Sequence, residues 1–115
     1  MPVNFDRHAR ESGHPGILRM KRPCVYILSN KRNGTLYVGV TSDVLRRVWE
    51  HQSGVVDGFA ERHGTRSLVH AEFFETMADA ILREKQIKKW RRAWKIQLIE
   101  VTNPSWRDLY REFSE

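Results

Sequence analysis

The pattern of apolar and polar positions from residue 24 to residue 41 is that of two short strands joined by a tight turn. Apolar and β-branched residues dominate Cys24–Asn30 and again Thr35–Thr41, which is the composition of strands. The dipeptide Asn33-Gly34 lies between them. It is the strongest short signal for a hairpin, because a type I′ turn requires positive φ at both central residues. The segment therefore predicts an antiparallel β-hairpin.

A hairpin with Asn33 and Gly34 at its turn has a fixed register. The pairs that follow are Asn30 with Tyr37, Leu28 with Gly39, and Tyr26 with Thr41. Because side chains alternate between faces, Tyr26, Gly39 and Tyr37 share one face. The opposite face is expected to be the main core face and carries Val25, Ile27, Leu36, Val38 and Val40. Gly39 leaves a gap between the tyrosines, and glycine inside a strand marks close approach by another group.

The segment after the hairpin has the spacing of an amphipathic helix. Ser42 or Asp43 can cap a helix that runs to about Gln52. Its apolar stripe consists of Val44, Leu45 and Val48. Arg47 and His51 lie one turn apart on one face. Because an arginine fork matches phosphate oxygens and a histidine can move a proton near neutral pH, this face is a candidate for phosphodiester chemistry. Without the hairpin beside it, an ordinary basic surface helix would be the better interpretation.

The rest of the chain predicts one more strand and three helices. The strand covers Ser67–Glu75, with His70 on its surface, and a helix covers Met77–Trp90. Arg92–Val101 continues this helix or starts another, and Pro104 opens a last short helix. The fold class is then α/β of the α+β type. It is a small three-stranded antiparallel sheet flanked by helices, in the order β-β-α-β-α-α plus a short C-terminal helix.

Composition predicts one domain. Residues 1–22 have no clear periodicity and are expected to be a disordered extension, with Met20 as the natural start, and residues 23–113 form the domain. With 40% hydrophobic residues and no apolar run of membrane-spanning length or signal peptide, we expect a cytoplasmic protein without membrane contact. The single cysteine, Cys24, excludes an intrachain disulfide and a Cys-rich zinc site.

The formal net charge of +6 comes from one short segment. Residues from Arg83 to Lys95 include seven Lys or Arg and a single acid, Glu84, while the other charges balance. Such a basic stripe favours binding of a polyanion with salt-sensitive affinity, although a solvated helix face has the same pattern. The candidates for substrate binding are Lys88, Lys89 and Arg92 in this segment, together with Gly39 and Arg46.

Two tryptophans, Trp90 and Trp94, lie four residues apart in the same basic segment. Ile87 and Leu98 extend the same apolar stripe. We therefore expect both tryptophans to be core anchors and not platforms for base stacking.

The tripeptides of the hairpin resemble those that name the GIY-YIG nuclease domain, the module of certain homing endonucleases and excision-repair nucleases. They stand here as Cys24-Val25-Tyr26 and Tyr37-Val38-Gly39. The first departs from Gly-Ile-Tyr at two positions and keeps the tyrosine, and the second differs only by Val for Ile. The resemblance covers roughly residues 24–110. It is closest to the small stand-alone bacterial members.

The same resemblance assigns roles to residues of the helices. The family's arginine falls on Arg47, its histidine or tyrosine on His51, and its metal-binding glutamate on Glu84. It implies an endonuclease that hydrolyses phosphodiester bonds in DNA with Mg²⁺ or Mn²⁺. Either Tyr26 or Tyr37 would be the base, Arg47 would neutralise phosphate charge, His51 would position or relay a proton, and Glu84 would hold the metal. The site would lie on the exposed sheet face beside the first helix.

Several interpretations stay open. Glu84 can equally form a helix ion pair with Lys88, and Asn103 is either the family's asparagine or the cap of a last helix. A nucleic-acid-binding domain without catalysis would need only the basic helix, and a partner module would dock an acidic protein on it. Motifs of other enzymes, such as a Gly-rich phosphate loop or His-Glu-x-x-His, are absent from the sequence. The sequence does not distinguish DNA from RNA as the substrate. It also leaves open a protein partner that supplies specificity and the oligomeric state.

Overall fold

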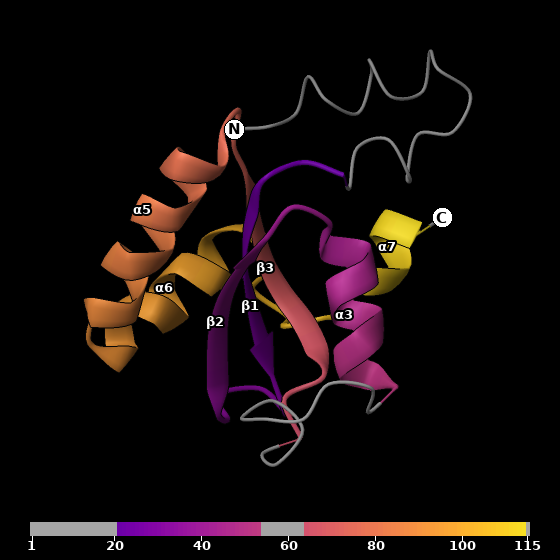
Figure 1. The fold of residues 1–115 in the computed structure, drawn as a ribbon. Helices are drawn as coiled ribbons and strands as arrows, with labels where there is room; N and C mark the ends of the chain where they lie inside the picture. Colours follow the sequence, from indigo (N-terminus) through magenta and orange to yellow (C-terminus); the bar gives the residue numbers. More distant parts are fainter. Residues whose placement is uncertain (1–20, 54–63, 115) are drawn as a thin grey trace.

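The computed structural model describes residues 21–53 and 64–114, and the predictions for residues 1–20 and for the loop over residues 54–63 lie outside them. The order of elements is the one predicted, with an α+β fold (Figure 1). The elements are β1 (Cys24–Ser29), β2 (Leu36–Thr41), α3 (Val44–Gln52), β3 (Ser67–Phe73), α5 (Met77–Lys89), α6 (Arg92–Thr102) and α7 (Tyr110–Ser114). No helix in the described ranges has the length and apolar character needed to cross a membrane.

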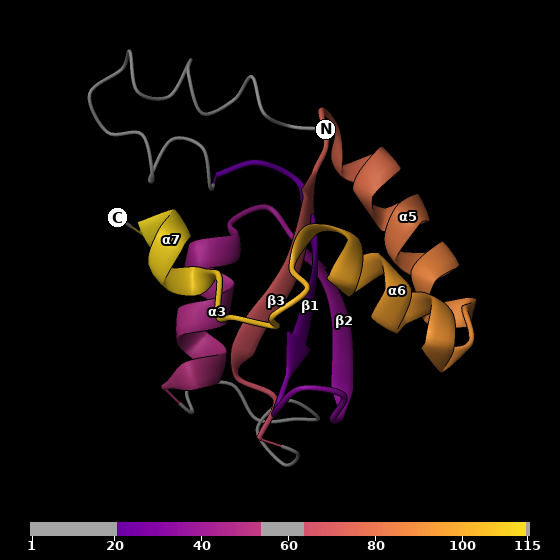
Figure 2. The same ribbon diagram turned by 180° about the vertical axis from the view of Figure 1, so that it is seen from behind.

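The three strands form an antiparallel sheet in the order β2-β1-β3, so that β1 is central and β2 is an edge strand. Helices α5 and α6 cover one face and α3 and α7 cover the other, as the two opposite views show (Figures 1 and 2). Each face has its own core. The face under α5 and α6 buries Val25, Ile27, Val38, Val69, Ala80, Ile87, Ile99 and Trp106. The face under α3 and α7 buries Cys24, Tyr26, Leu28, Val44, Val48 and Leu68.

The second core corrects the expectation of one main core face and one exposed face. The residues of the predicted exposed face include Tyr26, which is only 2% exposed. The apolar stripe of α3 and the aromatic side chains of α7 pack on this face, so helices cover both faces of the sheet. A site on this face must therefore lie between the sheet and α3.

The predicted register of the hairpin is wrong by two residues. Tyr26 pairs with Gly39 and Leu28 pairs with Tyr37. The reason is the turn, in which Asn33 alone has a positive φ, of 57°, whereas a two-residue type I′ turn needs two such residues. The loop is longer and is closed by the Asn30 side chain, whose Oδ1 accepts a hydrogen bond from the Thr35 amide at 2.9 Å. A shift by an even number of residues keeps every side chain on its face.

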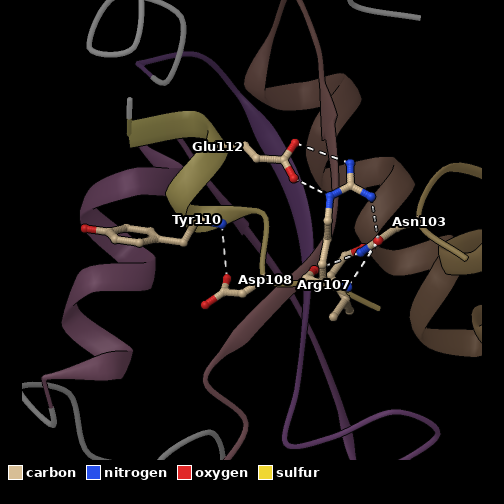
Figure 3. A network of polar contacts seen from close by, with 6 residues as sticks. Asn103, Arg107, Asp108, Tyr110 and Glu112 are labelled. Carbon is tan, nitrogen blue, oxygen red and sulfur yellow. Dashed lines mark hydrogen bonds and ion pairs between the residues drawn. The ribbon is translucent and has the colours of Figure 1, made fainter. Parts of the chain in front are cut away.

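The open edge of β3 is covered by the segment that follows α6. The Asn103 side chain donates to the Val69 carbonyl at 3.1 Å. The Leu68 amide donates to the Asp108 carboxylate at 3.0 Å, and the Leu109 amide donates to the Leu68 carbonyl at 2.7 Å. Figure 3 shows the network of Asn103 and Asp108 at this edge. These bonds satisfy backbone groups that an edge strand otherwise leaves unpaired.

Two local predictions are corrected in the same region. Pro104 does not open a helix, because Asn103–Trp106 forms a turn and α7 begins only at Tyr110. His70 is buried instead of lying on the strand surface. A register irregularity between Ile27 and Leu28, opposite His70, accompanies this change.

Candidate active site

Three aromatic side chains, from β1, β2 and α3, meet between the sheet and α3. The ring centroids of Tyr26 and Tyr37 are 6.2 Å apart, and that of His51 is 5.3 Å from Tyr37 in an edge-to-face arrangement. Nε2 of His51 is 3.5 Å from the Tyr26 hydroxyl, at the limit of a hydrogen bond. Tyr26 is buried, whereas Tyr37 is half-buried at the edge strand. The structure therefore brings together three of the four residues predicted to be catalytic.

Gly39 makes room for the Tyr26 ring. A Cβ atom at Gly39 would lie 2.5 Å from both Cζ and the hydroxyl oxygen of Tyr26, which is well inside van der Waals contact. The close approach expected at this glycine is thus made by a tyrosine of the site. The space that Gly39 leaves is filled from within the protein.

Burial and charge act on the two groups that meet at the Tyr26 hydroxyl. Burial raises the pKa of Tyr26 above its ordinary value, with further increases from Tyr37 beside it, and the positive charge of Arg47 opposes this. Burial and then the charge of Arg47 lower the pKa of His51, against the opposing effect of Glu50. Tyr26 is therefore a protonated phenol and His51 a neutral imidazole near neutral pH.

His51 has one unused ring nitrogen. Its Nδ1 is buried and finds no hydrogen-bond partner among residues 21–53 and 64–114. A buried polar atom left without a partner costs stability, so its presence needs an explanation. Together with the neutral ring, this places a proton acceptor or donor beside the tyrosines.

Arg47 lies on α3 between this aromatic cluster and solvent. Its side chain is 42% exposed, and its Nε is 3.8 Å from Oε1 of Glu50. The other oxygen of Glu50 binds Nε of Arg46 at 3.4 Å. A polar cleft of about 270 Å³ opens here at the start of the helix, lined by Thr41, Ser42, Asp43, Arg46, Arg47 and Glu50. Two guanidinium groups and two carboxylates line the cleft, and the guanidinium groups can bind an anion such as a phosphate.

The residues before Arg47 shape this cleft. The Asp43 carboxylate caps α3 by accepting from the Arg46 amide at 3.2 Å, and the Asp43 amide donates to the Thr41 hydroxyl at 3.1 Å. Sequence reasoning named Ser42 or Asp43 as the cap, and the structure assigns the cap to Asp43. That reasoning did not assign Thr41 or Ser42 to the site. The signal was their position at the junction of strand and helix, directly before the first turn of α3.

Glu84 lies on α5, which packs on β2 and β1 from the face opposite to α3. The Glu84 side chain is 11% exposed, and its carboxylate binds Nζ of Lys88 at 2.6 Å. The ion pair weighed from the sequence is therefore formed. Because Lys88 is 54% exposed at its side chain, it is free to leave. Residues 21–53 and 64–114 contain no group of three or more His, Cys, Asp or Glu arranged to hold a metal, so a metal here would keep most of its waters.

The other predicted binding residues do not form one surface. Arg92 donates from Nη2 to the carbonyls of Asn33 and Gly34, at 2.5 and 2.6 Å, and so fixes α6 to the tip of the hairpin. Lys89 is exposed on α5. Arg46 is paired with Glu50 as stated above. The structure brings Arg46 to the cleft of Arg47 and leaves the lysines on the opposite face of the sheet.

Asn103 is a fully buried residue at the end of α6. Its amide nitrogen donates to the carbonyls of Val69 and Arg107, and its oxygen accepts from the Arg107 amide at 3.2 Å. Figure 3 shows it turned toward Arg107, which in turn binds Glu112 on α7. These contacts describe a residue that ties a turn to β3.

Trp94 is not the core anchor that the sequence suggested. Its side chain is 49% exposed, whereas Trp90 packs on the core of the α5 face. Trp90 and Arg91 are extended, with ψ of 151° and 157°. They interrupt the helix, so the apolar stripe of α5 does not continue into α6.

A second polar cluster lies on the α5 face. Nε2 of His70 is 2.8 Å from one carboxylate oxygen of Glu72, and Arg83 binds both oxygens of Glu72 at 2.9 and 3.1 Å. Burial raises the pKa of Glu72, but the hydrogen bonds from His70 and Arg83 outweigh it and hold the pKa at about 2. This cluster joins β3 to α5 and leaves Glu72 ionised.

Comparisons with known proteins show the family to which the chain belongs. The model of the GIY-YIG catalytic domain matches residues 22–97. A UPF0213 protein of Syntrophus aciditrophicus is 38% identical over 82 residues, covering 70% of this chain and 93% of its own. One of Staphylococcus saprophyticus is 32% identical over 80 residues, covering 70% and 96%. The solution NMR structure of a UPF0213 protein from Bacillus halodurans is 30% identical, covers 76% of this chain and 92% of its own, and has a TM-score of 0.48. With the family model matched over more than half of its length, the chain belongs to the GIY-YIG catalytic domain family.

Proposed function

We propose that this chain is a divalent-metal-dependent endonuclease that hydrolyses phosphodiester bonds in DNA. The observation that carries the proposal is the convergence of Tyr26, Tyr37 and His51 beside the exposed Arg47. Such chemistry needs a base for water, positive charge near the phosphate and help for the leaving oxygen. Each of these needs has a candidate group at the cluster or on the neighbouring helix.

The phosphate would bind in the polar cleft at the start of α3. Arg47 has its guanidinium there, paired only loosely with Glu50 at 3.8 Å. A phosphate offers Arg47 a bidentate and charge-assisted contact that the long ion pair does not provide. Binding would therefore exchange a weak contact for a strong one, and Arg46 would add charge at the rim.

Tyr37 is the better candidate for the base. It is half-buried on the edge strand, where water and substrate can reach it. Tyr26 is buried on the central strand with a raised pKa, and its hydrogen bond with Tyr37 is one of the causes. A protonated Tyr26 can donate this bond to Tyr37 and stabilise negative charge on that oxygen. Tyr37 would then take the proton of the attacking water while Tyr26 positions it.

His51 would position Tyr26. As a neutral ring it can accept from the Tyr26 hydroxyl through Nε2, at 3.5 Å in the free protein, and catalytic hydrogen bonds often tighten only when the substrate is bound. The proton on Tyr26 then has two alternative acceptors, His51 and Tyr37.

Glu84 fits a hydrated Mg²⁺ or Mn²⁺ as a single carboxylate ligand, because a buried carboxylate with one mobile lysine partner can exchange Lys88 for a cation. When bound, the metal would supply positive charge to the leaving oxygen. The edge strand β2 lies between the helix of Glu84 and the helix of Arg47. A nucleic acid that runs along this edge can contact both residues.

The experiment measures cleavage of labelled single-stranded, duplex and branched DNA at low salt with Mg²⁺, Mn²⁺ or EDTA. Arg47→Ala and Glu84→Gln are expected to abolish cleavage and keep the circular dichroism of the wild type. Arg111→Ala and Glu75→Gln are matched controls, since both residues are exposed and neither lines the cleft of Arg47. Binding of DNA in EDTA with no cleavage in either metal would favour a non-catalytic nucleic-acid-binding domain. Full activity of Glu84→Gln in Mg²⁺ would exclude the single-metal scheme.

A further inference from the structure

An apolar groove on α6 has no role in the chemistry proposed above. It holds about 360 Å³ and is lined by Trp90, Trp94, Gln97, Leu98 and Val101. The rings of Trp90 and Trp94 meet edge to face, with centroids 6.1 Å apart. Trp94 and Val101 are 49% and 74% exposed. An apolar groove with an exposed aromatic side chain at its edge is a feature of binding sites.

Cations surround this groove. The Arg91 guanidinium lies 5.1 Å from the centre of the Trp94 ring, and that of Arg83 lies 5.1 Å from the Trp90 ring. The segment from Arg83 to Lys95 carries the entire net positive charge of the chain. Because Arg83 is also paired with Glu72, the groove combines an aromatic surface with the positive charge of Arg91 on its rim.

The groove is held in a fixed place relative to the sheet and apart from the cluster of Tyr26 and Tyr37. Arg92 binds the backbone carbonyls of Asn33 and Gly34 at the hairpin tip. Helix α6 lies with α5 on the face opposite to α3, as both views show (Figures 1 and 2). A ligand in the groove would touch neither the tyrosines nor Arg47.

We propose that this groove binds an unpaired base of a single-stranded nucleic acid, with Trp94 as the stacking platform. The proposal deepens the function proposed above and rests on it for the class of substrate. Aromatic stacking accepts any base, and a positive groove follows the phosphates of the strand. Arg91 would move from the ring face to a phosphate and leave Trp94 to the base. Lys95, one residue beyond Trp94, would bind the next phosphate.

The charge of the surface selects this occupant over a second copy of the chain. Two copies packed through their α6 helices would bring both basic segments together, and like charges repel. A nucleic acid has the complementary charge and an unpaired base has the flat apolar face that the groove needs. A single-stranded arm held here would select substrates with a flap or an open end, which the cluster at α3 alone does not distinguish.

The test compares affinities in EDTA, where no cleavage occurs. Fluorescence anisotropy would follow a labelled oligothymidylate and a labelled blunt duplex. Trp94→Ala is expected to weaken binding of the single strand about five-fold or more, with little change on the duplex. Trp94→Phe should keep most of the affinity. Leu82→Ala removes another exposed apolar side chain, 59% exposed on α5, and should behave as the wild type.

Equal affinity of Trp94→Ala and wild type for the single strand would overturn the proposal, as would an equal loss on single strand and duplex. Sedimentation that shows a dimer lost in Trp94→Ala would assign the groove to a second copy and also overturn it. The two proposals fail separately. If the wild type cleaves DNA and Trp94→Ala binds single strands as the wild type does, the nuclease proposal stands and the groove proposal is rejected. If single-strand binding depends on Trp94 but no DNA is cleaved, the groove proposal stands and the nuclease proposal is rejected.

Discussion

The contact between Gly39 and Tyr26 makes a sharp prediction about both stability and activity. In Gly39→Ala the new methyl group would lie 2.5 Å from Cζ and from the hydroxyl oxygen of Tyr26, and 2.9 Å from Cε1. The ring is 2% exposed and packed against α3, so it has no free space to move into. The tyrosine must retreat by about 1 Å to reach ordinary van der Waals contact.

The magnitude follows from the packing of this site. Forcing an extra methyl group into a well-packed core costs about 1–3 kcal/mol. Replacing glycine by alanine also reduces the conformational entropy of the unfolded chain, which stabilises the folded protein by about 0.4–1 kcal/mol. We expect a net loss of roughly 1–2 kcal/mol, or a melting temperature lower by about 4–8 °C for each kcal/mol in a domain of this size. Displacing the Tyr26 hydroxyl by this distance should lower the cleavage rate about 10²-fold.

Urea unfolding followed by tryptophan fluorescence measures the first effect, and single-turnover cleavage measures the second. A double-mutant cycle with Tyr26→Leu isolates the contact. Gly39→Ala should cost nothing in the Tyr26→Leu background, because the ring that it meets is gone. The same loss in both backgrounds would show that the strand, and not the tyrosine, resists the methyl group. A wild-type stability and rate for Gly39→Ala would refute the reasoning altogether.

Three further predictions address other groups. The pKa of Glu72 is about 2 in the folded protein against the ordinary 4.5. Its contribution to the free energy of unfolding, at most about 3 kcal/mol, is therefore present above about pH 4.5 and is lost as the pH falls towards 2. Acid unfolding of the wild type should be steeper than that of Glu72→Gln. Asn103→Ala should lower the free energy of unfolding by about 2–3 kcal/mol, since it leaves buried carbonyls unpaired, and an unchanged denaturation midpoint would contradict this. Tyr37→Phe should lower the cleavage rate about 10²–10⁴-fold, and Tyr26→Phe should lower it less; the opposite order would make Tyr26 the base.

The sequence predicted the hairpin faces correctly although it placed the register wrongly. The face of a side chain depends only on whether its position in the strand is odd or even. The pairing, in contrast, depends on the conformation of a few loop residues, and the Asn30 side chain closes a longer turn than Asn33-Gly34 alone suggests. The shift by two residues left Tyr26 and Tyr37 on one face. It also set Gly39 directly opposite Tyr26.

The fate of Trp94 shows why a periodic pattern has limited reach. The apolar spacing from Ile87 to Leu98 fits one continuous helix, and on such a helix both tryptophans would face the core. Two extended residues, Trp90 and Arg91, break the helix, and the pattern contains no proline or glycine to announce the break. The hydrogen bonds of Arg92 to the hairpin tip stabilise the new direction. Such a tertiary contact is invisible in a single sequence.

The different roles proposed for the two tyrosines follow from the strand order, which the sequence does not specify. Tyr26 lies on β1, the central strand, where neighbours on both sides and α3 above it remove it from water. Tyr37 lies on β2, an edge strand, with one side open to solvent. Had β2 been central and β1 at the edge, the same two residues on the same face would have exchanged their environments. Burial then keeps one phenol protonated as a hydrogen-bond donor. The other is left accessible to water and phosphate, so two chemically identical side chains can take different parts in one reaction.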